Sequence, residues 1–426
     1  MNIQAPRGTK DILPPEIYLW QEIERAVHEV AATFGYEEIR TPIFEQLRLF
    51  KRAVGEETDI VSKEMYVFQD RGGEDFALRP ELTASTIRAG LEHNLITQQG
   101  ALQRLYYNSQ PNFRYEKPQL GRQRQFHQFG TELLGSASPM GDADTINFAV
   151  SVFRKLGLSN FTVKLNSLAS REARAAWRDE LVSYLKGFES QLSADSQKRL
   201  LTNPIRVLDS KDKGDREIIK NAPLLIDKLE GEDKEHFEGV KSLLQSIDLE
   251  YTIDPYLVRG LDYYSRTVFE VTSSDLGSQD TLCGGGRYDY LVEQLGGSAV
   301  PAVGFAAGVE RLVISLSKLR EAQQKLKVDA FLIGMNAESR PVLFELANRL
   351  RGAGIATMFD VQERSMKAQM REANRLGTRF VMILGESELA SQTIVVKNME
   401  DSSQETIPMS EVVSFLSARQ RSSAAV

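Results

Sequence analysis

The chain has 426 residues, of which 42% are apolar and 26% are charged, a composition typical of globular proteins. This length suggests two or three domains rather than one core. The net charge of −7 does not by itself indicate a nucleic-acid-binding protein, although local basic surfaces decide such binding. The single cysteine, Cys283, excludes an internal disulfide framework and a cysteine-based zinc site, and the four scattered histidines predict no metal centre.

The N-terminal half opens with "MNIQAPRGTKDILPP", which lacks the apolar core of a signal peptide. No apolar run approaches the ~20 residues that span a membrane. The single cysteine fits a reducing cytosol, so we expect a cytoplasmic protein. Apolar periodicity and glycine or proline breaks then predict alternating elements. In order, these are a helix ending at Gly35, a strand over 36–46 interrupted by Pro42, a short helix, a hairpin over 64–81, a helix over 81–95, strands over 104–116 and 124–135, and a helix over 143–158.

The C-terminal half changes character at about residue 170. Charge rises and apolar residues recur at helical spacing, which predicts a helical insert over 170–249. Strand-like and glycine-rich segments return over 256–297, a helix is expected after Gly304, and 317–327 is a plausible linker. The rest alternates strand 328–334, helix 341–354, strand 355–360, helix 362–377 and strand 379–385. This alternation is typical of a small α/β domain with a parallel or mixed sheet.

The two strands over 104–135 enclose an unusually basic turn. Arg114 precedes it, Arg122 and Arg124 follow it, and Phe126 comes directly after them. Guanidinium groups suit bidentate contacts with phosphate or carboxylate, and a base stacked on a flat ring gains ~1–3 kcal/mol. The pattern therefore predicts a nucleotide site. A surface hairpin with solvated charges and Phe126 in the core would give the same sequence.

Two further segments carry charge beside glycine or proline. In "LRPELTAS", Glu81 stands where a strand gives way to a helix, so its carboxylate either caps the helix or holds an ammonium group. "LVRGLDYYSRTVFE" contains Arg259, and "CGGGRYD" has three glycines that permit close approach of a ligand or a positive φ. The glycine run is neither a P-loop nor a dinucleotide fingerprint. Arg311 lies in the expected helix after Gly304, where most arginines are simply solvated.

The predicted helix over 362–377 has a basic side and an apolar side. At ~100° per residue, the basic residues fall on about a third of its circumference: Arg364, Lys367, Arg371, Arg375 and Arg379. The opposite arc holds Met366, Met370, Ala373 and Leu376. The basic side is either an ordinary solvated face or a contact for a phosphate backbone.

The order and wording of five blocks resemble the histidyl-tRNA synthetases, which are class II aminoacyl-tRNA synthetases. The blocks are "LRPELTA", "FRYEKPQLGRQRQFHQFGTE", "LVRGLDYYSRTVFE", "GGGRYDYLVEQLGG" and "GFAAGVERL", and the resemblance covers nearly the whole chain. It implies an α+β catalytic domain with an antiparallel sheet over 1–169 and 250–322, a helical insertion domain over 170–249, and an α/β anticodon-binding domain over 327–426. It also implies a homodimer with the region around Pro42 at the interface.

The resemblance further implies roles for individual residues. The catalytic residues would be Arg114 and Arg259. ATP would contact Arg114, Glu116, Arg122, Phe126 and Arg311, with Mg²⁺ bridging its phosphates. Histidine would contact Glu81, Leu82, Thr83, Arg114, Gln128, Glu132, Arg259, Tyr263 and Tyr264. The tRNA would contact Arg122, Arg124, Arg364, Lys367, Arg371 and Arg375. Leu82 departs from the family pattern, because many members have glycine there.

The implied activity is the ATP-dependent activation of L-histidine to histidyl-adenylate and its transfer to the 3′ end of tRNA(His), with release of AMP and pyrophosphate. Two other functions use related folds. One is a histidine-sensing regulatory subunit of ATP phosphoribosyltransferase, which usually lacks the C-terminal domain and parts of the ATP and histidine motifs. The other is a module for sensing uncharged tRNA, which normally sits inside a larger kinase. Arg114, Glu116, Arg259 and Arg311 are all present here and favour the synthetase.

Overall fold

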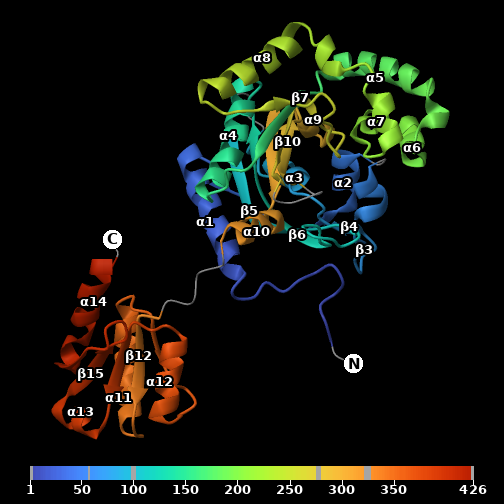
Figure 1. Cartoon of the computed structure of the whole chain (residues 1–426). Helices are drawn as coiled ribbons and strands as arrows, with labels where there is room; N and C mark the ends of the chain where they lie inside the picture. The colour runs from blue at the N-terminus through green and yellow to red at the C-terminus, as the bar shows by residue number, and fades with distance from the viewer. Residues whose placement is uncertain (1–2, 56–57, 97–101, 275–279, 321–327, 424–426) are drawn as a thin grey trace. The chain divides into compact units, whose positions relative to one another are not determined.

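The computed structural model describes residues 3–55, 58–96, 102–274, 280–320 and 328–423 (Figure 1). The chain divides into two compact units, Met1–Ala322 and Gln323–Val426. Most of the predicted linker, residues 321–327, lies outside the described residues. None of the helices within the described ranges is long and apolar enough to cross a membrane.

The first unit alternates strands and helices in the predicted order. Its helices are α1 (Ile17–Phe34), α2 (Leu47–Val54), α3 (Thr83–Glu92), α4 (Pro139–Lys155), α5 (Arg171–Lys186), α6 (Ala194–Thr202), α7 (Lys213–Ile219), α8 (Gly231–Ser246), α9 (Leu291–Gln294) and α10 (Val309–Leu319). Its strands are β1 (Glu37–Glu38), β2 (Phe44–Gln46), β3 (Val67–Gln69), β4 (Asp75–Leu78), β5 (Gln103–Phe113), β6 (Gln125–Leu134), β7 (Thr162–Ser167), β8 (Thr252–Ile253), β9 (Ser265–Thr272), β10 (Thr281–Arg287) and β11 (Ala302–Gly308).

The main sheet of this unit has eight strands in the order β1-β5-β6-β11-β10-β9-β7-β8. Neighbours from β5 to β7 are antiparallel, and only the outermost pairs, β1 with β5 and β7 with β8, are parallel. The antiparallel class II type of sheet is therefore confirmed. A separate three-stranded sheet has the order β2-β4-β3 and contains the predicted hairpin.

Each face of the main sheet is covered by its own apolar core, because side chains alternate along a strand. Phe129 of β6 and Phe269 of β9 pack with α1, α4, α8 and α10 on one face. Leu134 of β6 and Val268 of β9 pack with α2, α3 and α9 on the other. Odd-numbered residues of β6 therefore face α1 and α10, and even-numbered ones face α3.

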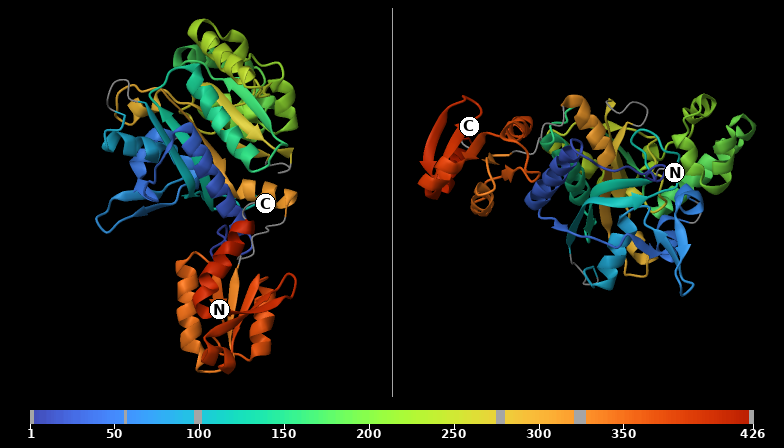
Figure 2. Two further views of the ribbon diagram at one scale, coloured as in Figure 1. Left: turned by 90° about the vertical axis from the view of Figure 1, so that its left-hand side faces the viewer. Right: turned by 90° about the horizontal axis from the view of Figure 1, so that it is seen from below.

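The segment predicted as a helical insert consists of α5 to α8 joined by short 3-10 turns. These helices gather at one end of the first unit in the views of Figures 1 and 2. Most of them enclose a small core around Trp177 and Leu181, whereas α8 contributes Phe237 and Val240 to the core of the main sheet. The insert is thus packed against the sheet as well as on itself.

One predicted boundary is wrong. The sequence favoured a helix beginning after Gly304, but Gly304 lies inside strand β11 and the helix α10 begins at Val309. The glycine is needed for packing, because a Cβ there would overlap the carboxylate of Glu132 on the adjacent strand β6. Strand β11 consists mostly of alanine and glycine, which give no alternation of large apolar and polar side chains, so its strand character is not visible in the sequence.

A buried ion pair ties the sheet to two helices. Arg287, at the end of β10, and Asp142, in the first turn of α4, are both fully buried. Arg287 also donates to the carbonyls of Ser136 and Ser138, at 2.7 and 3.2 Å. Nε2 of His236, on α8, lies 3.3 Å from the Asp142 carboxylate. Burial alone would raise the pKa of Asp142, but the charge of Arg287 lowers the pKa below its ordinary value.

The second unit is a mixed α/β domain, as predicted. Its strands are β12 (Ala330–Gly334), β13 (Thr357–Phe359), β14 (Phe380–Leu384), β15 (Thr393–Asn398) and β16 (Gln404–Pro408), in the order β13-β12-β14-β15-β16. Its helices are α11 (Ser339–Gly352), α12 (Met366–Arg375), α13 (Glu386–Ser391) and α14 (Val412–Ser423). Strand β12 is parallel to both of its neighbours, β13 and β14. The pairs β14 with β15 and β15 with β16 are antiparallel. Because Leu332 packs toward α11 and Phe331 toward α12, these helices cover opposite faces of the sheet.

Candidate active site

Glu132 is the most deeply buried carboxylate among the predicted site residues. It is fully buried on the face of β6 that is turned toward α3. It accepts hydrogen bonds from Oγ1 of Thr83 at 2.8 Å, from the hydroxyl of Tyr107 at 3.3 Å and from the hydroxyl of Tyr288. Burial raises the pKa of Glu132 to about 8, although these donors oppose the shift.

Tyr107 and Tyr288 were missed by the sequence analysis. Tyr107 lies on β5 beside Glu132, and Tyr288 follows the last residue of β10. Tyr107 lies in the strand predicted over 104–116 and Tyr288 in the block "GGGRYDYLVEQLGG", but their roles depend on the pairing of β5, β6, β11 and β10. The strand order was the missing information.

Glu81 occupies the start of α3, as one of its two predicted roles requires. Its carboxylate accepts the backbone N–H groups of Thr83 at 2.7 Å and Ala84 at 3.0 Å, so the capping role is confirmed. Burial raises the pKa of Glu81 above its ordinary value, with the two N–H donors acting against it. Leu82, buried between Glu81 and Thr83, adds an apolar wall.

Tyr263 and Tyr264, from the loop before β9, also lie near Glu132. Both are buried, and their ring centroids lie 4.7 Å apart. The ring of Tyr263 also packs edge-on against Tyr288 at 5.5 Å. On β6, Oε1 of Gln128 accepts a hydrogen bond of 3.1 Å from Asn112. Thr83, Tyr263 and Tyr264, three of the predicted histidine-contacting residues, thus lie around Glu132.

Arg259 lies flat against strand β10. A Cβ on Gly284 would overlap its guanidinium group, which explains one glycine of the run. Nη1 of Arg259 is 3.5 Å from the carboxylate of Glu270 on β9. The sequence predicted that these glycines allow a close approach, and the group that approaches Gly284 is a side chain of the same chain.

The basic hairpin gathers the other cations around the same face of the sheet. Nε of Arg114 donates to the carbonyl of Pro80 at 2.9 Å, and its guanidinium carbon lies 5.4 Å from the ring centroid of Phe126. Glu116 pairs with Arg122 at 3.3 Å. Phe126 is partly exposed rather than a core residue, which favours the nucleotide interpretation of this hairpin over the solvated one.

Arg311 reaches this cluster from the first turn of α10. Its Nη1 donates to the carbonyl of Thr281 at 2.5 Å and its Nε to the carbonyl of Gly121 at 3.4 Å. Burial lowers the pKa of Arg311, and the positive charges of Arg122 and Arg259 lower it further. Guanidinium groups that repel one another in a partly buried place stabilise an anion bound between them.

Arg124 is held at the base of the hairpin. Its guanidinium carbon lies 4.0 Å from the ring centroid of Tyr115, and its Nε donates to the carbonyl of Glu116 at 3.2 Å. The carbonyl of Gly8 accepts its backbone N–H at 2.7 Å. A Cβ on Gly8 would overlap the stem of Arg124, so the N-terminal segment packs closely on this residue.

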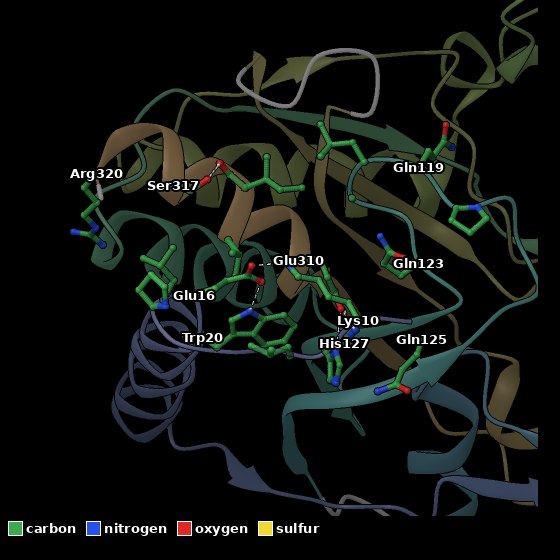
Figure 3. A pocket seen from close by; sticks show the side chains of 18 residues that line it. Lys10, Glu16, Trp20, Gln119, Gln123, Gln125, His127, Glu310, Ser317 and Arg320 are labelled. Carbon is green, nitrogen blue, oxygen red and sulfur yellow. Dashed lines mark hydrogen bonds and ion pairs between the residues drawn. The ribbon is translucent and has the colours of Figure 1, made fainter. Parts of the chain in front are cut away.

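A cavity of about 760 Å³ lies on the opposite side of β6 (Figure 3). Trp20, His127 and Glu310 line it, and Nδ1 of His127 is 2.9 Å from the Glu310 carboxylate. Since His127 is odd-numbered on β6, the cavity faces α1 and α10, whereas Phe126 and Gln128 face α3. This cavity is therefore on the other side of the sheet from the predicted substrate-binding residues.

The basic stripe of the second unit is shorter than predicted. Helix α12 starts at Met366, so Arg364 precedes it and pairs with Asp360. Arg379 lies beyond its end, 5.2 Å from the ring centroid of Phe380. Lys367 and Arg371 are exposed on α12, whereas Arg375 pairs with Glu372 at 2.6 Å.

The apolar side of α12 also differs from the prediction. Ala373 is buried against β12 and β14, with Met370 and Leu376 partly buried beside it. Met366 is 38% exposed, so it is not part of this core. Gln369 is buried instead, because its amide donates to the carbonyls of Gly334 and Arg364. A pattern of apolar residues does not predict the burial of a polar side chain such as Gln369, because that burial depends on nearby hydrogen-bond acceptors.

Comparison with known proteins assigns both units. Residues 8–312 match the family model described as histidyl-tRNA synthetase, and residues 329–419 match the one described as anticodon binding domain. A relative from Picosynechococcus sp., named histidine–tRNA ligase, is 47% identical over 415 residues, which cover 97% of each chain.

Solved structures agree. The crystal structure of apo S. aureus histidyl-tRNA synthetase has a TM-score of 0.82 and 35% identity, and the match covers 97% of this chain and 100% of that chain. A Bacillus halodurans structure, titled as an ATP phosphoribosyltransferase regulatory subunit/histidyl-tRNA synthetase, has a TM-score of 0.63 at 23% identity, covering 90% of this chain and 98% of that chain, and shares the fold. The chain therefore belongs to the histidyl-tRNA synthetase family.

Proposed function

We propose that this chain is a histidine–tRNA ligase, which activates L-histidine with ATP and transfers the histidyl group to the 3′ end of tRNA(His), releasing AMP and pyrophosphate. The observation that carries the proposal is the charge arrangement on one face of the main sheet. Buried Glu81 and Glu132 share this face with Arg114, Arg259 and Arg311, and Arg114 donates to the carbonyl of Pro80, next to Glu81. The buried carboxyls suit the N–H groups of histidine, and the guanidinium groups suit its carboxylate and the phosphates of ATP.

The amino acid lies beside the buried carboxyls. Glu132 and Tyr264 bind the imidazole nitrogens, with Tyr263 beside them. Glu81, Thr83 and Gln128 surround the α-ammonium group, and Leu82 forms part of the floor. Because Glu132 is buried, an isostere without the ring N–H groups leaves it unpaired, which costs binding strongly, by ~10⁴-fold or more.

Activation needs positive charge rather than a strong base. A carboxylate oxygen of histidine forms a bond to the α-phosphorus of ATP, the bond from that phosphorus to the β-bridging oxygen breaks, and pyrophosphate leaves with the electron pair. Arg114 and Arg259 contact the α-phosphate and the histidine carboxylate, and Arg311 binds the γ-phosphate. These fixed cations stabilise the charge that develops in the transition state.

The hairpin completes the ATP site. Phe126 stacks on the adenine ring, Glu116 lies beside the base, and Arg122 reaches the phosphates once it leaves Glu116. Mg²⁺ supplies further charge on the phosphates when bound. Among the described residues, no three potential ligand side chains gather into a metal cage. Glu270, 3.5 Å from Arg259, would help to hold such an ion together with phosphates and water.

Transfer to tRNA uses both units. Arg122 and Arg124 lie at the hairpin that faces the 3′ end, and the stripe of Arg364, Lys367, Arg371 and Arg375 contacts the tRNA backbone. In this assignment, residues 1–169 and 250–322 form the catalytic domain, 170–249 the insertion domain and 327–426 the anticodon-binding domain. Arg364 and Arg375 must exchange their carboxylate partners for phosphate.

A regulatory subunit of ATP phosphoribosyltransferase is the alternative. It needs a histidine site but no complete set of ATP-binding cations, and it usually lacks the C-terminal domain. This chain has Arg114, Arg259 and Arg311 around one site, and its second unit matches an anticodon-binding model. Both features favour the ligase. Histidine-dependent ATP–pyrophosphate exchange separates the two: no exchange by a folded chain that binds histidine would support the regulator.

The working form is a cytoplasmic homodimer. Ile43, Phe44, Val67 and Phe68 are each 41–51% exposed on or next to the small sheet β2-β4-β3, close to the predicted interface at Pro42. Such a patch of large apolar side chains suits a second copy of the chain. Sedimentation velocity at micromolar concentration should give twice the mass of one chain, and Phe44→Asp should shift it toward one. A wild-type monomer would refute the dimer.

Arg259→Ala tests the role of the cation on β10. We expect exchange of pyrophosphate into ATP to fall by at least 10³-fold, since a fixed transition-state donor is lost. The fold should persist, because Arg259 lies over Gly284 and leaves no buried apolar cavity. Near-normal exchange in this variant would rule out the assigned role. Circular dichroism and histidine binding serve as controls for folding.

Glu132→Gln tests the state of the buried carboxyl. A raised pKa in the folded state means that folded Glu132 keeps its proton between its ordinary pKa of 4.5 and about 8, whereas the unfolded chain loses it. The contribution of Glu132 to the free energy of unfolding therefore falls as pH rises through this window, by up to ~1.4 kcal/mol per pH unit.

Urea unfolding of the wild type and Glu132→Gln at pH 5, 6, 7 and 8 measures this contribution as a difference. The stability of the wild type relative to the variant should decrease steadily from pH 5 to pH 8. The exposed Glu235→Gln on α8 is the matched control. A difference that does not change with pH would mean that Glu132 is already ionised in the folded chain.

Neutralising the exposed part of the stripe tests tRNA binding. In Lys367→Ala/Arg371→Ala, we expect the KM for tRNA to rise about ten-fold and its salt dependence to weaken, with exchange unchanged, because two phosphate contacts are lost. Arg349→Ala on α11, which covers the opposite face of the sheet, is the matched control. Equal losses in charging and exchange would show that the stripe acts on the catalytic site or on folding.

A further inference from the structure

The segment that carries the proposed histidine-binding tyrosines has little structure of its own. Residues 258–264 lie outside any helix or strand, and β9 begins only at Ser265. Yet Arg259, Tyr263 and Tyr264 must hold fixed positions around Glu132 and the phosphates. A loop without ladder hydrogen bonds takes its conformation from side chains that contact its backbone.

The helical insert supplies one such side chain, Arg174. From α5, its Nη1 donates to the backbone carbonyl of Tyr264. Among the described residues, no carboxylate forms an ion pair with Arg174, and burial lowers its pKa. Holding a desolvated guanidinium against a single carbonyl has a cost in stability. Its position is better explained by the contact with Tyr264 than by stability alone.

A second contact lies two residues upstream. Nδ2 of Asn203, at the end of α6, donates to Oδ1 of Asp262 at 2.7 Å. Asp262 also packs closely against Gly55, the residue after α2. A Cβ added to Gly55 would lie 2.9 Å from Oδ2 of Asp262. Arg206, three residues after Asn203, lies 3.4 Å from Asp59. Asp262 is therefore fixed between the insert and the α2 region.

We propose that Arg174 and Asn203 are positioning residues through which the helical insert holds residues 262–264 in the histidine-binding conformation. Neither side chain needs to touch substrate: one fixes the main chain at Tyr264 and the other fixes the side chain at Asp262. The insert and the amino-acid pocket are then coupled, so that a movement of the insert changes the affinity for histidine. This inference rests on the proposed function, since the binding of histidine is its readout.

Steady-state ATP–pyrophosphate exchange with purified full-length variants tests the coupling. In Arg174→Ala, we expect the KM for histidine to rise about ten-fold, the effect of losing one charge-assisted hydrogen bond. The KM for ATP should stay within about two-fold, because Arg114 and Arg311 lie outside this loop and Arg259 is held separately, against Gly284 and Glu270. Arg174→Lys retains a donor and should recover part of the loss. Arg178→Ala, exposed one turn later on α5, is the matched control.

Asn203→Ala provides a second variant that removes little buried surface. It should raise the KM for histidine about three-fold, again with the KM for ATP nearly unchanged. An unchanged KM for histidine in folded Arg174→Ala or in Asn203→Ala would overturn the proposal. So would an equal rise of both KM values, no recovery with lysine, or the same effect from Arg178→Ala, because each indicates a general structural role.

Measurements on the wild-type chain distinguish a failure of this proposal from a failure of the ligase function on which it rests. If the wild type shows no histidine-dependent exchange, the ligase function fails, whatever the variants do. Isothermal titration of histidine into the wild type and Arg174→Ala still tests the coupling in that case. Weaker histidine binding by the variant supports the coupling, and equal binding overturns it.

Discussion

The site depends on one steric constraint: glycines must stand where a long polar side chain lies against a neighbouring strand of the main sheet. Arg259 rests on Gly284 of β10, and Glu132 faces Gly304 of β11. A methyl group at either glycine would overlap a charged group. Flanking strands, helices and the tyrosines around Glu132 then restrict water, so burial raises the pKa of that carboxyl and strengthens every interaction with it. The glycines are therefore part of the electrostatics of the site.

Alternation along β6 separates the site from the support behind it. Phe126, Gln128 and Glu132 face α3, while His127 and Phe129 face α1 and α10. Glu310 accepts the backbone N–H of His127, and its neighbour Arg311 donates to the carbonyl of Thr281 on β10. Strand β6 and helix α10 thus fix each other's position, and the cavity in Figure 3 lies on the support side.

The polar groups of the site match those of the proposed substrates. In the proposed assignment, the buried carboxyls of Glu81 and Glu132 bind the N–H groups of histidine, and the arginines bind its carboxylate and ATP. Separate partners for the N–H groups and for the anionic groups orient an amino acid before it reacts. The loop over 258–264 contributes to both kinds of partner, through Arg259 and through its tyrosines. That loop is also where the insert contacts the site, through Arg174 and Asn203.

The sequence by itself determined the order of the elements in the first unit, the basic hairpin, the helical insert, the α/β character of the second unit and, through its motifs, the family. These features are local, since periodicity, glycine breaks and charge spacing are readable within a few turns of chain. Only the tertiary structure decided that Gly304 lies in a strand and that Arg379 lies beyond the end of α12. The same holds for the hydrogen bonds of Tyr107 and Tyr288 to Glu132. It also holds for the contact of Arg174 with Tyr264. The physical reason is that strand order and the docking of the insert join residues far apart in the chain, and such contacts leave no spacing pattern in the sequence.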